Sequence, residues 1–198
     1  MKRHVPIFLL IAGVVLFGYL FTQPKAVFES FSRSQNFTPL PQEASAARFN
    51  YLSKNGNSSC SASFRDSIFS MPDDARLQGS CCSPMSFHRY SEQVEGLKQY
   101  KDIPEIPSDP YDIEAGLAKR LMGYYDMELT QEEQEAYDYA MANSHEKGPC
   151  CCKCWRWYVY GGLGKYLIRN YGWSGEQVTE IWNLSDGCGG EGEHGISH

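Results

Sequence analysis

The pattern of apolar and polar positions divides the chain into four stretches. Residues 1–21 contain an unbroken apolar run behind a basic tip. Residues 22–58 are rich in Ser, Gln, Asn, Pro and Ala and show no sustained period, which is typical of an extended or partly disordered stalk. Apolar residues recur at helical spacing over residues 59–190, and residues 191–198 are polar and glycine-rich. We therefore predict a membrane anchor, a flexible stalk, one folded domain and a flexible tail.

The apolar run from Val5 to Phe21 predicts where the chain is placed in the cell. It is at the short end of what spans a bilayer. Lys2 and Arg3 precede it, so the positive-inside rule places the N-terminus in the cytoplasm and the remainder of the chain outside. A cleaved signal peptide is the alternative, although residues 24–26 form a poor cleavage site. Both interpretations place the folded domain outside the cytoplasm, and the first predicts a single-pass protein held in the cell membrane by this helix.

Local start signals predict several helices within residues 59–190. A proline after a capping or turn residue marks the first helical position in three places, and capping boxes mark two more. These signals are Ser83-Pro84, Asp109-Pro110, Thr130 with Glu133, Gly148-Pro149, and Ser174 with Gln177. Ser61 is positioned to cap a further short helix. Because no stretch shows convincing strand alternation, the predicted fold class is all-α, a small cysteine-rich helical domain.

Composition adds cysteine chemistry to this picture. The net charge of −6 argues against nucleic-acid binding, because a phosphate backbone attracts clustered Lys and Arg. The eight cysteines are too clustered to be incidental. They stand in four groups, and all eight are candidate metal ligands: Cys60; Cys81 and Cys82; Cys150, Cys151, Cys152 and Cys154; and Cys188.

The largest of these groups follows Pro149 and is predicted to lie on a helix. Residues 150–154 would occupy its first turn, where positive partial charge favours thiolate over thiol. On that turn Cys154 would share a face with Cys150 and Cys151. Cys152 would point elsewhere, towards the other cysteine groups.

Local charge around this group favours thiolates as well. Five basic residues and no acidic residue lie between positions 147 and 173, and a cationic neighbourhood lowers the pKa of cysteine. The alternative is that these bases form a solvated helix face. They are Lys147, Lys153, Arg156, Lys165 and Arg169.

Bunched thiolates suit a soft metal ion, with copper as Cu(I) slightly ahead of zinc and an iron–sulfur cluster as a further candidate. Structural disulfides are the main alternative, since cysteines outside the cytoplasm usually pair. Four cysteines within five residues are awkward for independent bridges, however. Thiol–disulfide redox chemistry is the third hypothesis. We predict no catalytic residue, and enzymatic activity is the less favoured interpretation.

Other residues near the cysteines add secondary expectations. His88 and His145 are weaker candidates for metal ligands. Glycines at 161, 162 and 164 indicate close helix packing or a helix break. Glycines also flank Cys188, which would allow close approach of the backbone to a ligand. The many aromatic residues after position 154 are expected to form core beside the cysteines.

The segment Pro149-Cys150-Cys151-Cys152-Lys153-Cys154 resembles the P-C-Y-C-G-C motif of a family of bacterial extracytoplasmic proteins. The proline and three cysteines, Cys150, Cys152 and Cys154, match in register. Cys151 and Lys153 depart from the motif, and the downstream His and Cys of that family are lacking. The resemblance implies an exported location and metal handling.

Overall fold

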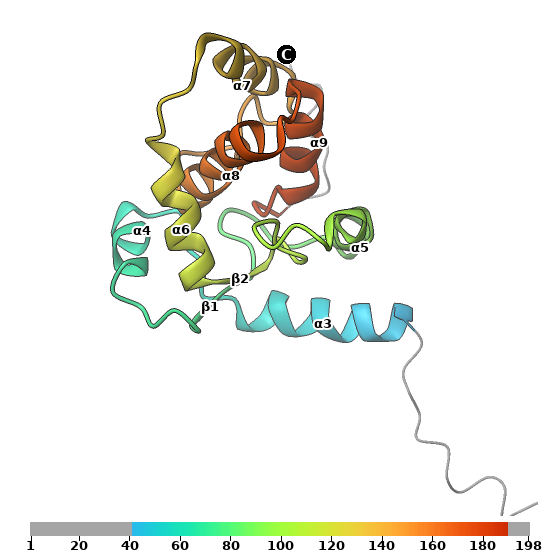
Figure 1. The fold of residues 1–198 in the computed structure, drawn as a ribbon. Coiled ribbons are helices and arrows are strands. Elements are labelled where there is room, and N and C mark those ends of the chain that lie inside the picture. The colour runs from blue at the N-terminus through green and yellow to red at the C-terminus, as the bar shows by residue number, and fades with distance from the viewer. Residues whose placement is uncertain (1–40, 190–198) are drawn as a thin grey trace, which may run out of the picture. The chain divides into compact units, whose positions relative to one another are not determined.

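The computed structural model describes residues 41–189. The expected anchor, residues 1–21, and the expected tail, residues 191–198, lie outside the described residues. Seven helices and a small two-stranded sheet make up the described part (Figure 1). None of the helices in this part has the length and apolar character needed to cross a membrane. The structure is therefore mostly helical, as predicted, with a small sheet that was not predicted.

The elements follow one another in this order: α3 (Pro41–Asn55), α4 (Ala62–Ile68), β1 (Arg76–Gln78), α5 (Phe87–Leu97), the short 3-10 helix η2 (Lys98–Tyr100), β2 (Asp112–Glu114), α6 (Ala115–Tyr125), α7 (Gln131–Asn143), α8 (Trp155–Tyr171) and α9 (Gly175–Ser185).

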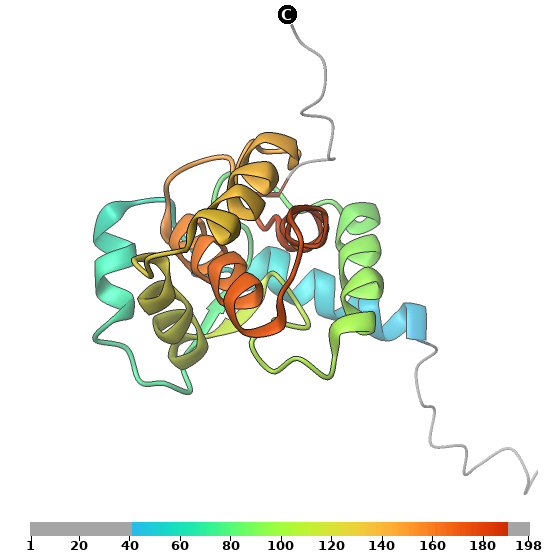
Figure 2. The ribbon, with the colours of Figure 1, turned by 45° about the horizontal axis from the view of Figure 1, so that its top comes forward.

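Helix α8 is the centre of the packing. Helices α6, α7 and α9 all contact it, and the two views of the ribbon show it running between them (Figures 1 and 2). It is apolar on most sides, and its buried residues include Trp155, Val159, Tyr160 and Leu163. A helix that is apolar nearly all round must be enclosed by other elements. The aromatic core predicted after position 154 is thus confirmed for Trp155 and Tyr160.

Glycines allow α8 to approach its neighbours closely. A Cβ atom at Gly162 would lie 1.8 Å from the Leu121 carbonyl oxygen of α6, so only glycine fits there. A Cβ atom at Gly164 would lie 2.9 Å from the Trp182 ring of α9. Helix α8 remains continuous through these positions. Of the two expectations for these glycines, close packing is confirmed and a helix break is wrong.

Three helix starts were predicted correctly, and the three proline signals were not. Ser61 caps α4 as expected, whereas the helix expected after Gly148-Pro149 begins only at Trp155. The capping boxes of Thr130 with Glu133 and of Ser174 with Gln177 are both present, at the starts of α7 and α9. The signal at Asp109-Pro110 instead precedes β2, and the helix begins later, at Ala115. The reason is that Asp112–Glu114 pairs antiparallel with Arg76–Gln78, so tertiary pairing overrides the local signal.

The signal at Ser83-Pro84 was also wrong, since α5 begins at Phe87. The Ser83 hydroxyl donates to the Cys188 carbonyl oxygen over 3.0 Å, so it joins two distant loops rather than capping a helix.

The C-terminal part of the expected stalk is helical. Helix α3 occupies residues 41–55, which we expected to be extended or partly disordered. Leu52 of α3 is buried with Tyr90 and Tyr111, and the rings of Phe49 and Phe87 meet at 5.3 Å between centroids. The polar composition of the segment hid these few apolar contacts, because they depend on a surface supplied by α5.

The close contact of α6 with α8 gives a testable prediction. Gly162→Ala should lower the free energy of unfolding by about 2–3 kcal/mol, because the added methyl group collides with backbone rather than with a side chain that can move. Gly123→Ala on α6 is the matched control, since a Cβ atom there has no neighbour within 4 Å. It should raise stability by about 0.5–1 kcal/mol, and chemical denaturation of the reduced protein measures both changes. Equal effects of the two substitutions would contradict this account of the packing.

Candidate metal centre

All eight cysteines converge in one place, although they come from four separate segments. Every one of them is a free thiol in the structure, and the described residues include all eight. We call this group the thiol cluster. Each sulfur lies within 4 Å of at least one sulfur from another cysteine. The cluster contains every cysteine predicted as a ligand, including Cys60, which no close sequence spacing connects to the others.

The segment with four cysteines lies before α8, not on it. Cys154 is the N-cap residue of the helix, and residues 150–153 form bends. The Cys154 amide donates to the Cys152 carbonyl oxygen over 2.8 Å, a tighter turn than a helix makes. Our placement of these cysteines on a first helical turn was therefore wrong. Cys150 and Cys154 nevertheless meet, with 3.8 Å between their sulfurs.

Buried hydrogen bonds fix the start of this segment. The Ser144 hydroxyl at the end of α7 donates to the Gly148 carbonyl oxygen over 3.0 Å and accepts from the Gly148 amide over 2.8 Å. Gly148 has a φ of +154°, which L side chains rarely adopt, and a Cβ atom there would collide with the Trp157 ring. The turn into the cysteine segment is therefore built around a glycine.

The loop of Cys188 is joined to the loop of Cys81 and Cys82. The Ser83 amide and hydroxyl both donate to the Cys188 carbonyl oxygen, over 2.9 and 3.0 Å. A Cβ atom at Gly189 would lie 2.1 Å from the Ser83 carbonyl oxygen, and the φ of Gly189 is +83°. The predicted role of the glycines beside Cys188, close backbone approach, is present here between two protein loops.

Cys60 reaches the cluster from the turn before α4. Ser61 caps this helix as predicted, accepting from the Phe64 amide over 3.1 Å. The Cys60 sulfur lies 2.8 Å from that of Cys82 and 3.7 Å from that of Cys152.

The spacing of the sulfurs is close to that of a tetrahedral metal site. Four sulfurs bound at about 2.3 Å to one ion stand about 3.8 Å apart. Six pairs lie 3.6–3.8 Å apart: Cys81–Cys82, Cys81–Cys154, Cys82–Cys151, Cys82–Cys152, Cys150–Cys154 and Cys60–Cys152. Three pairs are closer, at 2.8–3.0 Å, and a bound ion would widen them by about 1 Å: Cys60–Cys82, Cys150–Cys188 and Cys151–Cys188. The cysteines can therefore hold a metal ion.

Burial is graded across the thiol cluster. Cys150, Cys154 and Cys188 are buried, with 1, 2 and 4% of their surface exposed. Cys82 and Cys151 are exposed, and the remaining three are half-buried. The cluster thus has an inner side against the core and an outer side in contact with solvent. An ion could enter from the outer side without unfolding of the domain.

The thiols do not ionise equally. Hydrogen bonds from the Cys150, Cys154 and Cys188 thiols lower the pKa of Cys81. A hydrogen bond from Cys150 lowers the pKa of Cys151 to about 5. The Cys150 thiol, which donates, has its pKa raised. The cluster therefore begins to ionise at Cys81 and Cys151.

Burial acts in the opposite direction on the thiols of Cys60 and Cys82. It raises the pKa of Cys60 to about 12 and also raises the pKa of Cys82. These thiols stay protonated at neutral pH unless a metal ion displaces the proton.

A buried arginine lies next to the thiols. Arg156 has no exposed surface, and its charge contributes to the lowered pKa of Cys81. Its guanidinium donates to the backbone carbonyl oxygens of Gly79 and Pro110. Sequence reasoning grouped Arg156 with four other bases as a solvated face or a cationic setting. The structure separates it from Lys165 and Arg169, which donate to Met127 and to Glu133 instead.

Neither histidine belongs to the thiol cluster. The His88 side chain is 85% exposed and pairs with Glu92. The groups of described residues that could hold a metal ion consist of cysteines alone. The weaker prediction that His88 or His145 adds a ligand therefore finds no support in the geometry.

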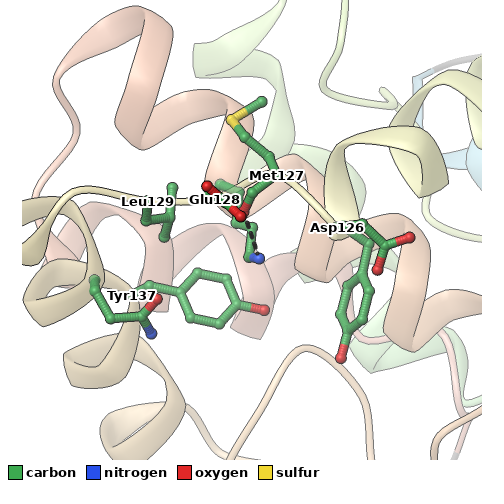
Figure 3. Close-up of a pocket in the computed structure, with 8 residues that line it drawn as sticks. Asp126, Met127, Glu128, Leu129 and Tyr137 are labelled. Atoms are coloured by element: carbon green, nitrogen blue, oxygen red, sulfur yellow. Dashed lines mark hydrogen bonds between the residues drawn. The ribbon is translucent and has the colours of Figure 1, made fainter.

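A separate cavity lies away from the thiols (Figure 3). It has a volume of about 600 Å³ and lies beside the segment 126–129, between α6 and α7. Lys165 lines it and donates to the Met127 carbonyl oxygen over 2.8 Å, and Tyr137 lies on its wall. No cysteine lines this cavity, so it is separate from the thiol cluster.

Comparison with protein-family models, with curated proteins and with solved structures gives no match to this chain. The resemblance to the P-C-Y-C-G-C family stays a prediction. Functional inference therefore depends on the chemistry of the thiol cluster.

Cys151 and Cys82 form a matched pair for a test of this electrostatic account, because both are exposed and their pKa values are shifted in opposite directions. At pH 7 the lowered pKa of Cys151 favours its thiolate, whereas the raised pKa of Cys82 favours its thiol. In the reduced, metal-free protein, iodoacetamide should alkylate Cys151 at least about tenfold faster than Cys82. Peptide mapping by mass spectrometry after short exposure measures the ratio. Preferential labelling of Cys82 would refute the ordering.

Proposed function

We propose that this protein binds a soft metal ion, copper as Cu(I) or zinc as Zn(II), through the thiol cluster on the outer side of the cell membrane. The observation that carries the proposal is the convergence of eight free thiols from four segments, at sulfur–sulfur distances close to those of a metal–thiolate site. Soft ions are the ones that prefer an all-thiolate environment.

The disulfide hypothesis is less consistent with this arrangement. A bridge joins two sulfurs at about 2.05 Å and isolates the pair from other sulfurs. Here Cys82 lies within 4 Å of the sulfurs of Cys60, Cys151 and Cys152, as well as that of its neighbour Cys81. Such shared contacts are typical of ligands around ions. A thiol oxidoreductase would need one reactive pair isolated from other thiols, whereas the three closest pairs here share Cys188 or contact further sulfurs.

The close spacing also bears on the identity of the bound group. An iron–sulfur cluster contains inorganic sulfide between its irons, and its cysteines surround that body. The thiols here are already within 2.8–3.8 Å of their neighbours, which favours metal ions bound directly between thiolates over a centre that contains inorganic sulfide. The absence of a histidine ligand among the described groups favours Cu(I) slightly over Zn(II), which also uses imidazole.

The location in the membrane is part of the same proposal. It is supported by the apolar run from Val5 to Phe21 behind Lys2 and Arg3, and by the resemblance of the segment 149–154 to an exported family. An anchored domain with exposed Cys82 and Cys151 could exchange metal with other molecules at the membrane surface.

Elemental analysis combined with thiol titration tests metal binding. The reduced full-length protein should bind Cu(I) or Zn(II), and the bound metal should protect cysteines from alkylation. Cys154→Ser should lower the affinity by about tenfold or more, because Cys154 contacts both Cys81 and Cys150. His88→Ala is the control and should bind as the unchanged protein does. Absence of bound metal, together with four disulfides in the protein purified without added reductant, would eliminate the proposal in favour of a disulfide-stabilised domain.

Cell fractionation tests the location. The full-length protein should remain with membranes after washing at high pH and should be released by detergent. Protease added to intact spheroplasts should digest the cysteine domain. Protection of the domain in intact spheroplasts would contradict the proposed topology, and release without detergent would favour a cleaved signal peptide.

A further inference from the structure

The possible metal positions share ligands. Three groups of cysteines have sulfurs close enough to hold an ion: Cys82 with Cys151, Cys152 and Cys188; Cys60 with Cys152 and Cys154; and Cys60 with Cys81 and Cys82. Cys60, Cys82 and Cys152 each belong to two of these groups. Two ions in neighbouring groups would therefore be bound by the same sulfur, and a thiolate has the lone pairs to bridge two ions.

The inner side of the cluster contains a positive charge, that of Arg156, which forms no ion pair with the residues that the structure describes. Arg156 is completely buried, and its Nε atom has no hydrogen-bond partner. Its remaining hydrogen bonds go to neutral carbonyl groups, those of Gly79 and Pro110. Within the described part of the chain it makes no ion pair, and Asp109, a carboxylate in its vicinity, is paired with Arg48. Burying a charge without a counter-charge costs free energy. An anion close to Arg156 would lower that cost.

The surroundings of Arg156 hold it in place against the cluster. Its guanidinium lies 4.5 Å from the centre of the Trp155 ring and 5.8 Å from that of Tyr111. A Cβ atom at position 187 would lie 2.2 Å from its Nη1 atom, so Gly187 leaves the room that the guanidinium occupies one residue before Cys188. The charges of the Cys81, Cys150 and Cys188 sulfurs act on it. Cys150 and Cys188 are buried members of the cluster and Cys81 is half-buried, so thiolates formed at these sulfurs would supply the anionic charge beside Arg156.

Resting on the proposed function, we infer that the thiol cluster takes more than one soft metal ion as a thiolate-bridged cluster of net negative charge, and that Arg156 is its internal counter-cation. Each thiol that binds loses one proton to solvent and forms a metal–sulfur bond. Copper enters as Cu(I), so no electron is transferred. Because the thiolates outnumber the positive charges of the ions, the loaded centre stays anionic, and the guanidinium offsets part of that charge. Arg156 is thus a positioning residue, since it binds no ion itself.

Metal stoichiometry of the full-length protein, loaded anaerobically with Cu(I) and separately with Zn(II), tests the bridged cluster. We expect at least two ions per chain and a metal–metal scattering contribution in X-ray absorption. One ion per chain would leave the proposed function standing and overturn this inference, as would two ions without metal–metal scattering. Absence of any bound ion would defeat the proposed function as well.

Substitution of Arg156 tests the counter-cation. Arg156→Met removes the charge and should weaken metal binding by about tenfold or more in competition with a chelator. Arg156→Lys keeps the charge but not the planar hydrogen-bonding geometry, and should recover most of the affinity. Native mass spectrometry should show that the loaded Arg156→Met protein retains one more proton than the unchanged protein.

The stability of the metal-free proteins separates this role from a purely structural one. Both variants lose hydrogen bonds to Gly79 and Pro110, so both should melt at lower temperature than the unchanged protein without metal. If affinity falls equally in Arg156→Lys and Arg156→Met, following their loss of stability, the arginine is only a structural link and the inference fails.

Discussion

The buried guanidinium of Arg156 connects the parts of this protein that otherwise belong to separate segments. One of its nitrogens donates to the carbonyl oxygen of Gly79, which leads from β1 to Cys81 and Cys82. Another donates to that of Pro110, just before β2. The space it occupies exists because position 187 is a glycine. Since Arg156 follows the last cysteine of the four-cysteine segment by two residues, one side chain fixes three cysteine-bearing segments relative to one another.

Around this link, the domain places its sulfurs by means of loops rather than helices. Ser144 fixes the turn at Gly148, and Ser83 fixes the loop of Cys188. The helices supply the base on which these loops lie, and α8 is held there by its glycine contact with α6. Because the cysteines lie on loops, a bound ion could widen the closest sulfur pairs by about 1 Å without moving the helices.

The distribution of charge and burial gives the thiol cluster two unlike sides. The inner side has buried thiols near Arg156, where a fixed positive charge would stabilise an anionic metal–thiolate centre. The outer side has exposed Cys82 and Cys151, where ions and other thiols can reach the sulfurs. Under the proposed function, the buried thiols would hold the bound ion firmly, and the exposed thiols would allow it to exchange with other molecules.

The sequence by itself determined the helical class, three capped helix starts and the full set of candidate ligands, because capping residues and cysteines are local signals. It did not determine that Asp112–Glu114 would pair as a strand, that residues 41–55 would form a helix, or that residues 150–153 would leave the helix. Tertiary structure decided these features, since each depends on a partner surface far away in the chain. It also decided which of five basic residues would face the thiols: Arg156 is buried beside them, and no sequence pattern distinguished it, because burial and pairing are properties of the packed chain.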